Sequence, residues 1–219
     1  MNAGDQLGPA AQQGDEQIGA DRLRKVVLVV AALNLTYFFI EFVAALSAGS
    51  VSLSADSVDF LEDTAVNLLI FVALGWPMAR RAAMGKAMAL IILGPAAVAT
   101  WLAIQRFSDA SAAPDVAPVV LVSVGAIAVN GTSASLLARV RHHGGSLSRA
   151  AYLSARNDVL VNVSIIVMAV VTLWTDSGWP DLILGCFIIL LALHAAHEVW
   201  EVSEEERLAT KALTGEAIG

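Results

Sequence analysis

Charged residues are scarce in this 219-residue chain, at 15% of the sequence, whereas hydrophobic residues make up 57% of it. Mean hydropathy is correspondingly high, at +0.69. A soluble globule of this size needs more polar side chains than this to cover its surface. The composition therefore excludes an ordinary soluble domain and predicts an all-α, polytopic membrane protein in contact with a lipid bilayer.

Cysteine is nearly absent, and basic residues are outnumbered. The single Cys186 excludes a disulfide within the chain and a metal site built on several thiolates. Lys and Arg total 13 against 20 Asp and Glu, so the net charge of -7 gives no reason to expect a nucleic-acid partner. The acidic balance favours a cationic cargo instead.

Six apolar windows are each long enough for a membrane helix, which needs about 20 residues. They cover residues 25–48, 54–76, 83–104, 118–138, 150–174 and 181–202. We therefore expect a six-transmembrane-helix bundle that forms one transporter domain over residues 22–203. Residues 1–21 are polar and lack the basic start and apolar core of a signal peptide, so we expect a disordered tail there, and a second short tail over residues 204–219.

Basic residues are concentrated in alternate loops. They lie before the first span (Arg22, Arg24, Lys25), after the second (Arg80, Arg81, Lys86) and between the fourth and fifth (Arg139, Arg141, Arg149), while the other loops hold only Arg106. By the positive-inside rule both termini are cytoplasmic. We expect the protein to reside in the cell membrane.

The second window contains an unusual group of acidic residues, in the stretch LSADSVDFLEDTAV. At about 100° per residue, Asp56, Asp59 and Asp63 share one helix face, Asn67 continues the stripe and Glu62 flanks it. A carboxylate at the bilayer centre costs on the order of 3 kcal/mol or more, so the stripe needs a cation, protons or water to compensate it. The alternative is that the carboxylates lie near the membrane surface or pair with basic residues to stabilise the bundle.

The fifth window carries a matching polar stripe. In YLSARNDVLVNVS, Ser154, Asp158 and Asn162 recur at every fourth residue and so share one face, whereas Arg156 and Asn157 are expected to point elsewhere. Two such stripes packed against each other would supply three or four oxygen ligands to one ion. The pattern predicts a cation site within the membrane.

These paired motifs resemble those of the cation diffusion facilitator family of divalent metal transporters. LSADSVDFLED is similar to the family's LADAxHxxxD segment, and SARNDVLVNVSIIV is similar to its HxxxDxxxN helix. Asn34, Glu41 and Asn130 also fall where the family tends to have polar residues. The resemblance covers residues 25–201.

The resemblance implies a four-ligand metal site made of Asp59, Asp63, Ser154 and Asp158. Asp56 and Asn162 are candidate additional ligands. It also implies a secondary transporter, not an enzyme, that exports zinc, cadmium, cobalt, iron or manganese from the cytoplasm in exchange for protons by alternating access. The metal is then the substrate, and no prosthetic group is expected. Carboxylates fit this role because they lose protons to hold a metal and regain them when it leaves.

The sequence departs from the family pattern in two respects. Asp59 and Ser154 stand where histidine is common, so the ligand set is rich in oxygen and the expectation moves from strict zinc selectivity towards manganese, iron or cobalt as well. The chain also ends soon after the sixth window, so we expect the family's cytoplasmic domain to be absent. A homodimer would then have to form through the spans.

The four histidines admit two interpretations each. His142 and His143 form either a metal-capturing loop or a solvated basic loop, and the second is favoured. Near the end of the sixth window, His194, His197, Glu198 and Glu201 recur at helical spacing. They form either a metal site at the entrance or simply a polar helix end that leaves the membrane.

Two other functions are compatible with acidic residues in a membrane. A membrane-embedded metalloenzyme is disfavoured because the chain has no His-Glu-x-x-His motif and its histidines lie far from the acidic stripe. A proton-coupled transporter of organic cations would usually add an aromatic cage around the amine. The helices that carry the stripes are poor in aromatic residues, so a metal is preferred.

Overall fold

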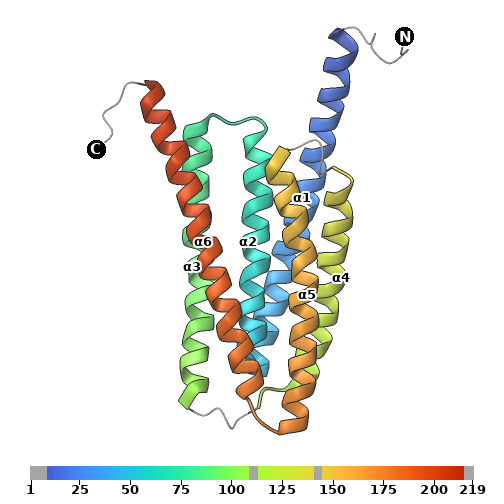
Figure 1. The fold of residues 1–219 in the computed structure, drawn as a ribbon, viewed down its shortest axis with the longest axis vertical. Coiled ribbons are helices and arrows are strands. Elements are labelled where there is room, and N and C mark those ends of the chain that lie inside the picture. The colour runs from blue at the N-terminus through green and yellow to red at the C-terminus, as the bar shows by residue number, and fades with distance from the viewer. Residues whose placement is uncertain (1–8, 109–112, 141–144, 215–219) are drawn as a thin grey trace.

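The computed structural model of the chain describes residues 9–108, 113–140 and 145–214. These residues form six α-helices that lie side by side in one elongated bundle (Figure 1). The helices are α1 (Pro9–Ala48), α2 (Val51–Ala73), α3 (Met78–Ser108), α4 (Val116–Ala138), α5 (Gly145–Thr175) and α6 (Trp179–Thr214). Each of the six apolar windows lies within one of these helices or overshoots its end by a few residues, which confirms the predicted all-α architecture.

Four helices are long and apolar enough to cross a membrane: residues 19–48 of α1, 83–108 of α3, α4, and 151–175 of α5. The four acidic residues of α2 exclude it from this group, and the apolar part of α6 is shorter, at Trp179–His194. Large apolar side chains such as Phe39, Trp101 and Leu121 face outward, as expected for contact with lipid. The chain is a multi-pass membrane protein, and the spans of α2 and α6 remain predictions.

The two predicted tails are shorter than expected. α1 begins at Pro9, so residues 9–21 extend the first helix, and α6 continues through residues 204–214. These segments contain several strong helix formers, Ala, Gln, Glu and Lys, so their polarity did not exclude a helix. Residues 1–8 and 215–219 lie outside the described part. α1 starts and α6 ends at the same end of the bundle (Figure 1), which we call the terminal end.

An ionic group joins α3 to α6 near the terminal end. Glu204 accepts hydrogen bonds from Arg207 on its own helix and from Lys86 on α3, and the Lys86 ammonium also lies 5.1 Å from the ring centre of Trp200. The hydrogen bonds from Arg207 and Lys86 lower the pKa of Glu204 to about 2. The carboxylate is therefore ionised throughout the physiological range, and this link between α3 and α6 persists there.

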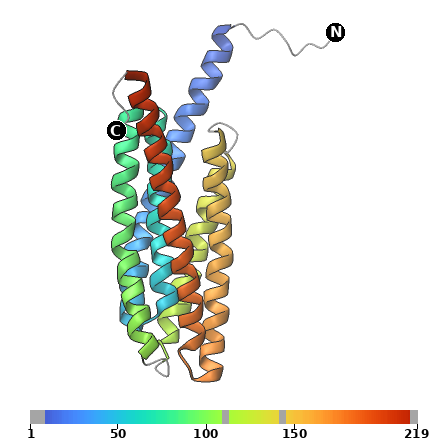
Figure 2. The same cartoon turned by 60° about the vertical axis from the view of Figure 1, so that its left-hand side comes forward.

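The hydrophobic core is continuous at one end of the bundle and divided at the other. At the end opposite the termini, which we call the closed end, one cluster includes buried residues from all six helices. At the terminal end a separate cluster joins only α1, α2, α4 and α5. Seen from the side, α5 and α6 meet at the closed end and diverge towards the terminal end (Figure 2).

At the closed end, a buried carboxylate connects the start of α6 to the start of α2. Asp181, in the first turn of α6, accepts hydrogen bonds from the Ser50 hydroxyl (2.7 Å), the Val51 amide (2.7 Å), and the amide and hydroxyl of Ser52. These amides begin α2, where free N–H groups and the helix dipole favour a negative charge. The helices also approach closely, because a Cβ on Gly185 would lie 2.7 Å from the Ser52 amide nitrogen. Asp181 therefore stabilises the packing of α6 against α2.

Replacing Asp181 with Ala should destabilise the bundle. The change leaves two buried amides and two buried hydroxyls without their acceptor, at a cost of about 2 to 3 kcal/mol, or an unfolding temperature lower by roughly 5 °C or more. Thermal unfolding of the purified protein in detergent measures the effect. Asp115→Ala is the matched control, because Asp115 caps α4 with a single exposed hydrogen bond of 3.3 Å to Ala117. Equal shifts for the two variants would contradict the role given to Asp181.

Candidate metal-binding site

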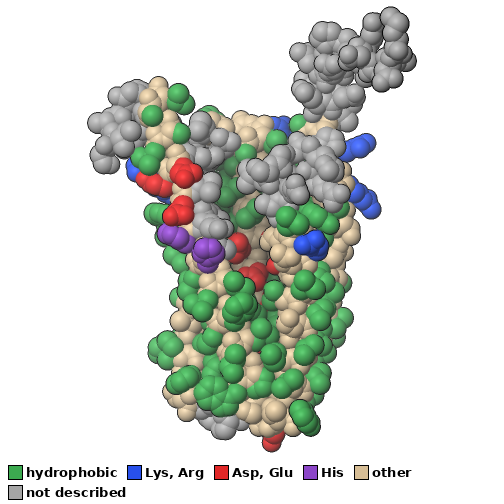
Figure 3. Space-filling view, in the orientation of Figure 1, with side chains coloured by type: hydrophobic (Ala, Val, Ile, Leu, Met, Phe, Trp, Pro, Cys, Tyr) green, Lys and Arg blue, Asp and Glu red, His purple; other side chains and the backbone are tan. Residues whose placement is uncertain are grey.

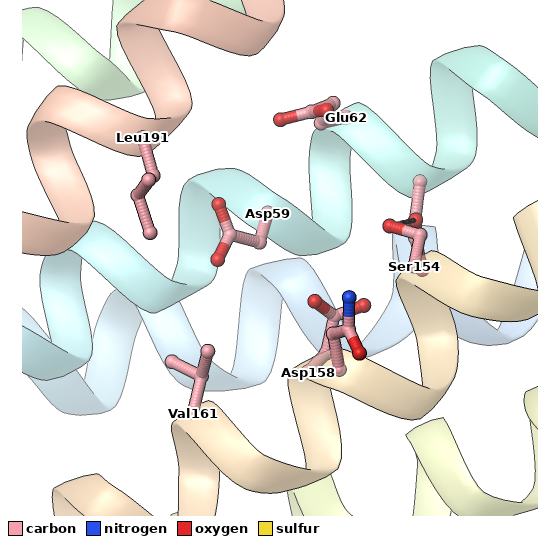
Figure 4. Close-up of a pocket in the computed structure, with 8 residues that line it drawn as sticks. Asp59, Glu62, Ser154, Asp158, Val161 and Leu191 are labelled. Carbon is pink, nitrogen blue, oxygen red and sulfur yellow. Dashed lines mark hydrogen bonds between the residues drawn. The ribbon is translucent and has the colours of Figure 1, made fainter. Parts of the chain in front are cut away.

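The acidic stripe of α2 faces a cavity of about 180 Å³ between α2, α5 and α6. Its lining consists of Asp59, Glu62, Asp63, Ser154, Asn157, Asp158, Val161 and Leu191. Asp59 and Glu62 project from α2 and Ser154 and Asp158 from α5 into the same space, with Leu191 of α6 along one side (Figure 4). The contacts of α5 with α2 and with α6 are sparser than those of the closest helix pairs, which leaves room for the cavity.

Asp63 is the most firmly held of these residues. Its Oδ1 accepts a hydrogen bond from the Ser154 hydroxyl on α5 (3.2 Å), and its Oδ2 accepts one from the Asn34 amide on α1 (3.3 Å). The side chain is 5% exposed. Asp63 therefore has a fixed position between three helices, and its oxygens keep lone pairs for a further ligand.

Asp59 and Asp158 are surrounded by other acidic groups. The charged groups that act on Asp59 are all acidic (Asp56, Glu62, Asp63 and Asp158), and those that act on Asp158 are also carboxylates. Over the part of the chain that the structure describes, none of the four aspartates forms an ion pair with Lys, Arg or His. Acidic side chains are visible in a hollow on one face of the bundle (Figure 3), so a cation could reach them from outside.

The structure brings all four predicted ligands, Asp59, Asp63, Ser154 and Asp158, to this one cavity. It does not place them at coordination distance: among the described residues, no three His, Cys, Asp or Glu side chains converge closely enough to hold a metal ion. Their role as ligands therefore remains a prediction. The observed contact between Ser154 and Asp63 shows that the two polar stripes do face each other.

The two candidate additional ligands lie elsewhere. Asp56 and Asn162 do not line the cavity; both are fully buried, and they lie next to each other one turn closer to the closed end. Conversely, Asn157 lines the cavity although we expected it to point away. It lies three residues after Ser154, so the helical spacing could have placed it beside the stripe. Leu191 is apolar and offered no signal in the sequence.

The histidines do not contribute to this cavity where the structure describes them. His194 and His197 lie on α6, and neither is among the lining residues. His197 forms an exposed ion pair of 3.3 Å with Glu201. His142, His143 and the side chain of Glu198 lie outside the described residues. Whether any of the four histidines binds a metal therefore stays open.

Substituting Ser154 with His should narrow the selectivity of the cavity towards zinc. Imidazole is a good zinc ligand, whereas manganese prefers oxygen, so we expect the ratio of zinc to manganese affinity to rise about tenfold or more. Competition binding to the purified protein measures this ratio. Ser164→His is the control, because Ser164 is an exposed residue of the same helix. An unchanged ratio in the Ser154 variant would show that this position does not face the ion.

Comparison with known proteins agrees with this geometry. Residues 27–205 match the cation efflux transmembrane domain. The chain is also 30% identical over 209 residues to zinc transporter ZitB of Escherichia coli (strain K12), an alignment that covers 86% of this chain and 64% of the relative. ZitB of Pectobacterium atrosepticum is 30% identical over 202 residues, which cover 84% of this chain and 61% of that protein. This chain thus spans less than two thirds of these curated relatives. The predicted resemblance is confirmed: the chain belongs to the cation efflux family of membrane transport proteins and is not an enzyme.

Proposed function

We propose that the chain exports divalent transition-metal cations from the cytoplasm and binds them at Asp59, Asp63, Ser154 and Asp158. The observation that carries this proposal is the cavity between α2, α5 and α6. Asp59 and Asp63 of α2 and Asp158 of α5 face one space there, and none of the three forms an ion pair with a basic side chain within the described residues. A divalent ion would offset the repulsion among these carboxylates and replace the solvation that burial removes.

The predicted ligands suit a class of divalent metals and do not select one metal. Oxygen ligands alone accommodate manganese, iron and cobalt as well as zinc and cadmium. The similarity to proteins named as zinc transporters supports including zinc among the substrates. Three carboxylates and one hydroxyl carry enough charge for any of these ions, so selectivity depends on the coordination geometry that the site adopts when it closes.

The division of the core suggests how the ion enters and leaves. All six helices pack together at the closed end, whereas α5 and α6 diverge at the terminal end. The basic loops favour a cytoplasmic location for the terminal end. The arrangement then corresponds to a state open to the cytoplasm. Alternating access would open the closed end and bring α5 and α6 together at the other, across their sparse contacts.

The chemistry of the site also supports proton antiport across the cytoplasmic membrane. Carboxylates bind a metal only when they are deprotonated, so metal binding releases protons and metal release takes them up. The same residues would thereby carry metal in one direction and protons in the other.

Asp158→Asn should abolish metal transport without unfolding the protein. The amide keeps the shape of the side chain but loses its charge, and we expect the rate of uptake into proteoliposomes to fall at least tenfold for zinc, cobalt and manganese. Asp176→Asn is the matched control, because Asp176 is exposed at the closed end, and asparagine tolerates its positive φ of 49°. Wild-type rates in the Asp158 variant would refute the assignment of the site.

Metal affinity should fall as the pH on the open side is lowered. Protons compete with the metal for the same carboxylates, so below the pH at which these groups are deprotonated the apparent dissociation constant should rise up to tenfold per proton displaced and per pH unit. A pH-sensitive dye inside the proteoliposomes should at the same time report proton flow opposite to the metal. An affinity that is constant between pH 5.5 and 8 would argue against proton coupling.

An organic cation is the less favoured substrate. Among the described residues, those that line the cavity include no aromatic side chain, and an amine site would usually provide a ring to face the charge. The acidity of the cavity alone does not distinguish an amine from a metal, but the absence of a ring in its lining favours the metal.

A further inference from the structure

A second group of buried polar side chains lies between the cavity and the closed end. It consists of Glu41 of α1, Asp56 of α2 and Asn162 of α5, which are 0%, 1% and 0% exposed. Asp56 precedes Asp59 by about one helical turn, and Asn162 follows Asp158 by one turn, so the group lies about 5 Å deeper along both helices. None of the three residues lines the cavity.

The three side chains face one another. The carboxyl groups of Glu41 and Asp56 are close enough to interact directly, and the Asn162 amide lies next to Asp56. Asn162 donates its Nδ2 hydrogen to the carbonyl oxygen of Asp158 (3.0 Å), which leaves its Oδ1 as an acceptor. Both carboxyl groups and Asn162 Oδ1 lack a hydrogen-bond partner of ordinary geometry. Five oxygen atoms from three helices are therefore buried together, and none of them receives a hydrogen bond of ordinary geometry among the described residues.

Such an arrangement is unfavourable unless something positive binds there. Each unpartnered buried acceptor costs about 1 to 3 kcal/mol, and two adjacent carboxylates repel each other as well. Neither Glu41 nor Asp56 pairs with a basic side chain within the described ranges. The nearby hydroxyl of Tyr37 cannot satisfy them, because it donates to the Val122 carbonyl oxygen (2.6 Å). A bound cation would satisfy all five oxygens and cancel the repulsion.

We propose that Glu41, Asp56 and Asn162 form a second cation site, which holds a divalent metal ion between the cavity and the closed end. Two carboxylates balance the charge of one such ion, and carboxylate and amide oxygens are hard ligands of the kind that manganese accepts. The inference extends the proposed function, because the ion reaches this site from the cavity. The ion would then bind at two successive sites as it passes through the bundle.

The number of metal ions bound per chain tests this proposal. The probe is Mn²⁺, because it binds poorly to exposed histidines and its free concentration can be measured by electron paramagnetic resonance. With the full chain purified in detergent we expect two ions for the wild type and one for Glu41→Gln and for Asp56→Asn. Asp158→Asn should also bind one ion, at the second site. Tyr37→Phe is the control, because its ring lies beside the group but its hydroxyl is not used, and it should bind two.

The outcomes separate this inference from the proposed function. Because glutamine and asparagine retain the shape of the acids that they replace, an unfolding temperature close to that of the wild type would show that the variants are folded. A wild-type stoichiometry below two, or two ions in Glu41→Gln and Asp56→Asn, would overturn the second site. The proposed function would survive that result as long as Asp158→Asn loses transport, and it would fall only if Asp158→Asn transports metal normally.

Discussion

The rest of this structure depends on one constraint. Several aspartates are buried in an apolar bundle, and within the described residues none of them forms an ion pair with a basic side chain. The charge of a carboxylate is strongly destabilised away from water unless hydrogen bonds or a counter-ion replace the lost solvation. Among these carboxylates, Asp63 accepts hydrogen bonds from Asn34 and Ser154. Asp59 and Asp158 form no ion pair with a basic side chain among the described residues, so their charge depends on what the bundle binds, and that dependence makes them suitable for transport.

The position of α2 follows from the same constraint. This helix is too acidic to face lipid, and it packs against α1, α3, α5 and α6, so that most of its residues are buried by protein. The other helices are apolar on their outer faces and can meet the membrane. A polar helix is thus tolerated because its neighbours, instead of lipid, surround it.

The sequence predicted which residues share one helix face, but it did not predict which residues of different helices meet. Helical spacing was enough to place Asp59 and Asp63 on one face and Ser154 and Asp158 on another, because both sets repeat every fourth residue. Spacing within one helix does not reveal which residue of another helix lies opposite. The sequence therefore identifies Glu41 only as a polar residue of the first span, whereas its approach to Asp56 depends on the packing of α1 on α2. The bonds of Asp181 to α2 span about 130 positions and could not be foreseen from a loop-like stretch.

The hydrogen bonds between Asp181 and the start of α2 also limit how α6 can move. They fix one end of α6, while an ionic contact between Lys86 and Glu204 joins the opposite end of α6 to α3. Leu191 lies ten residues from the fixed point, or roughly 15 Å at 1.5 Å per residue, and Glu204 lies roughly 35 Å from it. A tilt of about 6° would shift Leu191 by roughly 1.5 Å and Glu204 by more than twice as much. A helix held at the closed end in this way would act as a lever, and a small rotation about that end would change the width of the cavity.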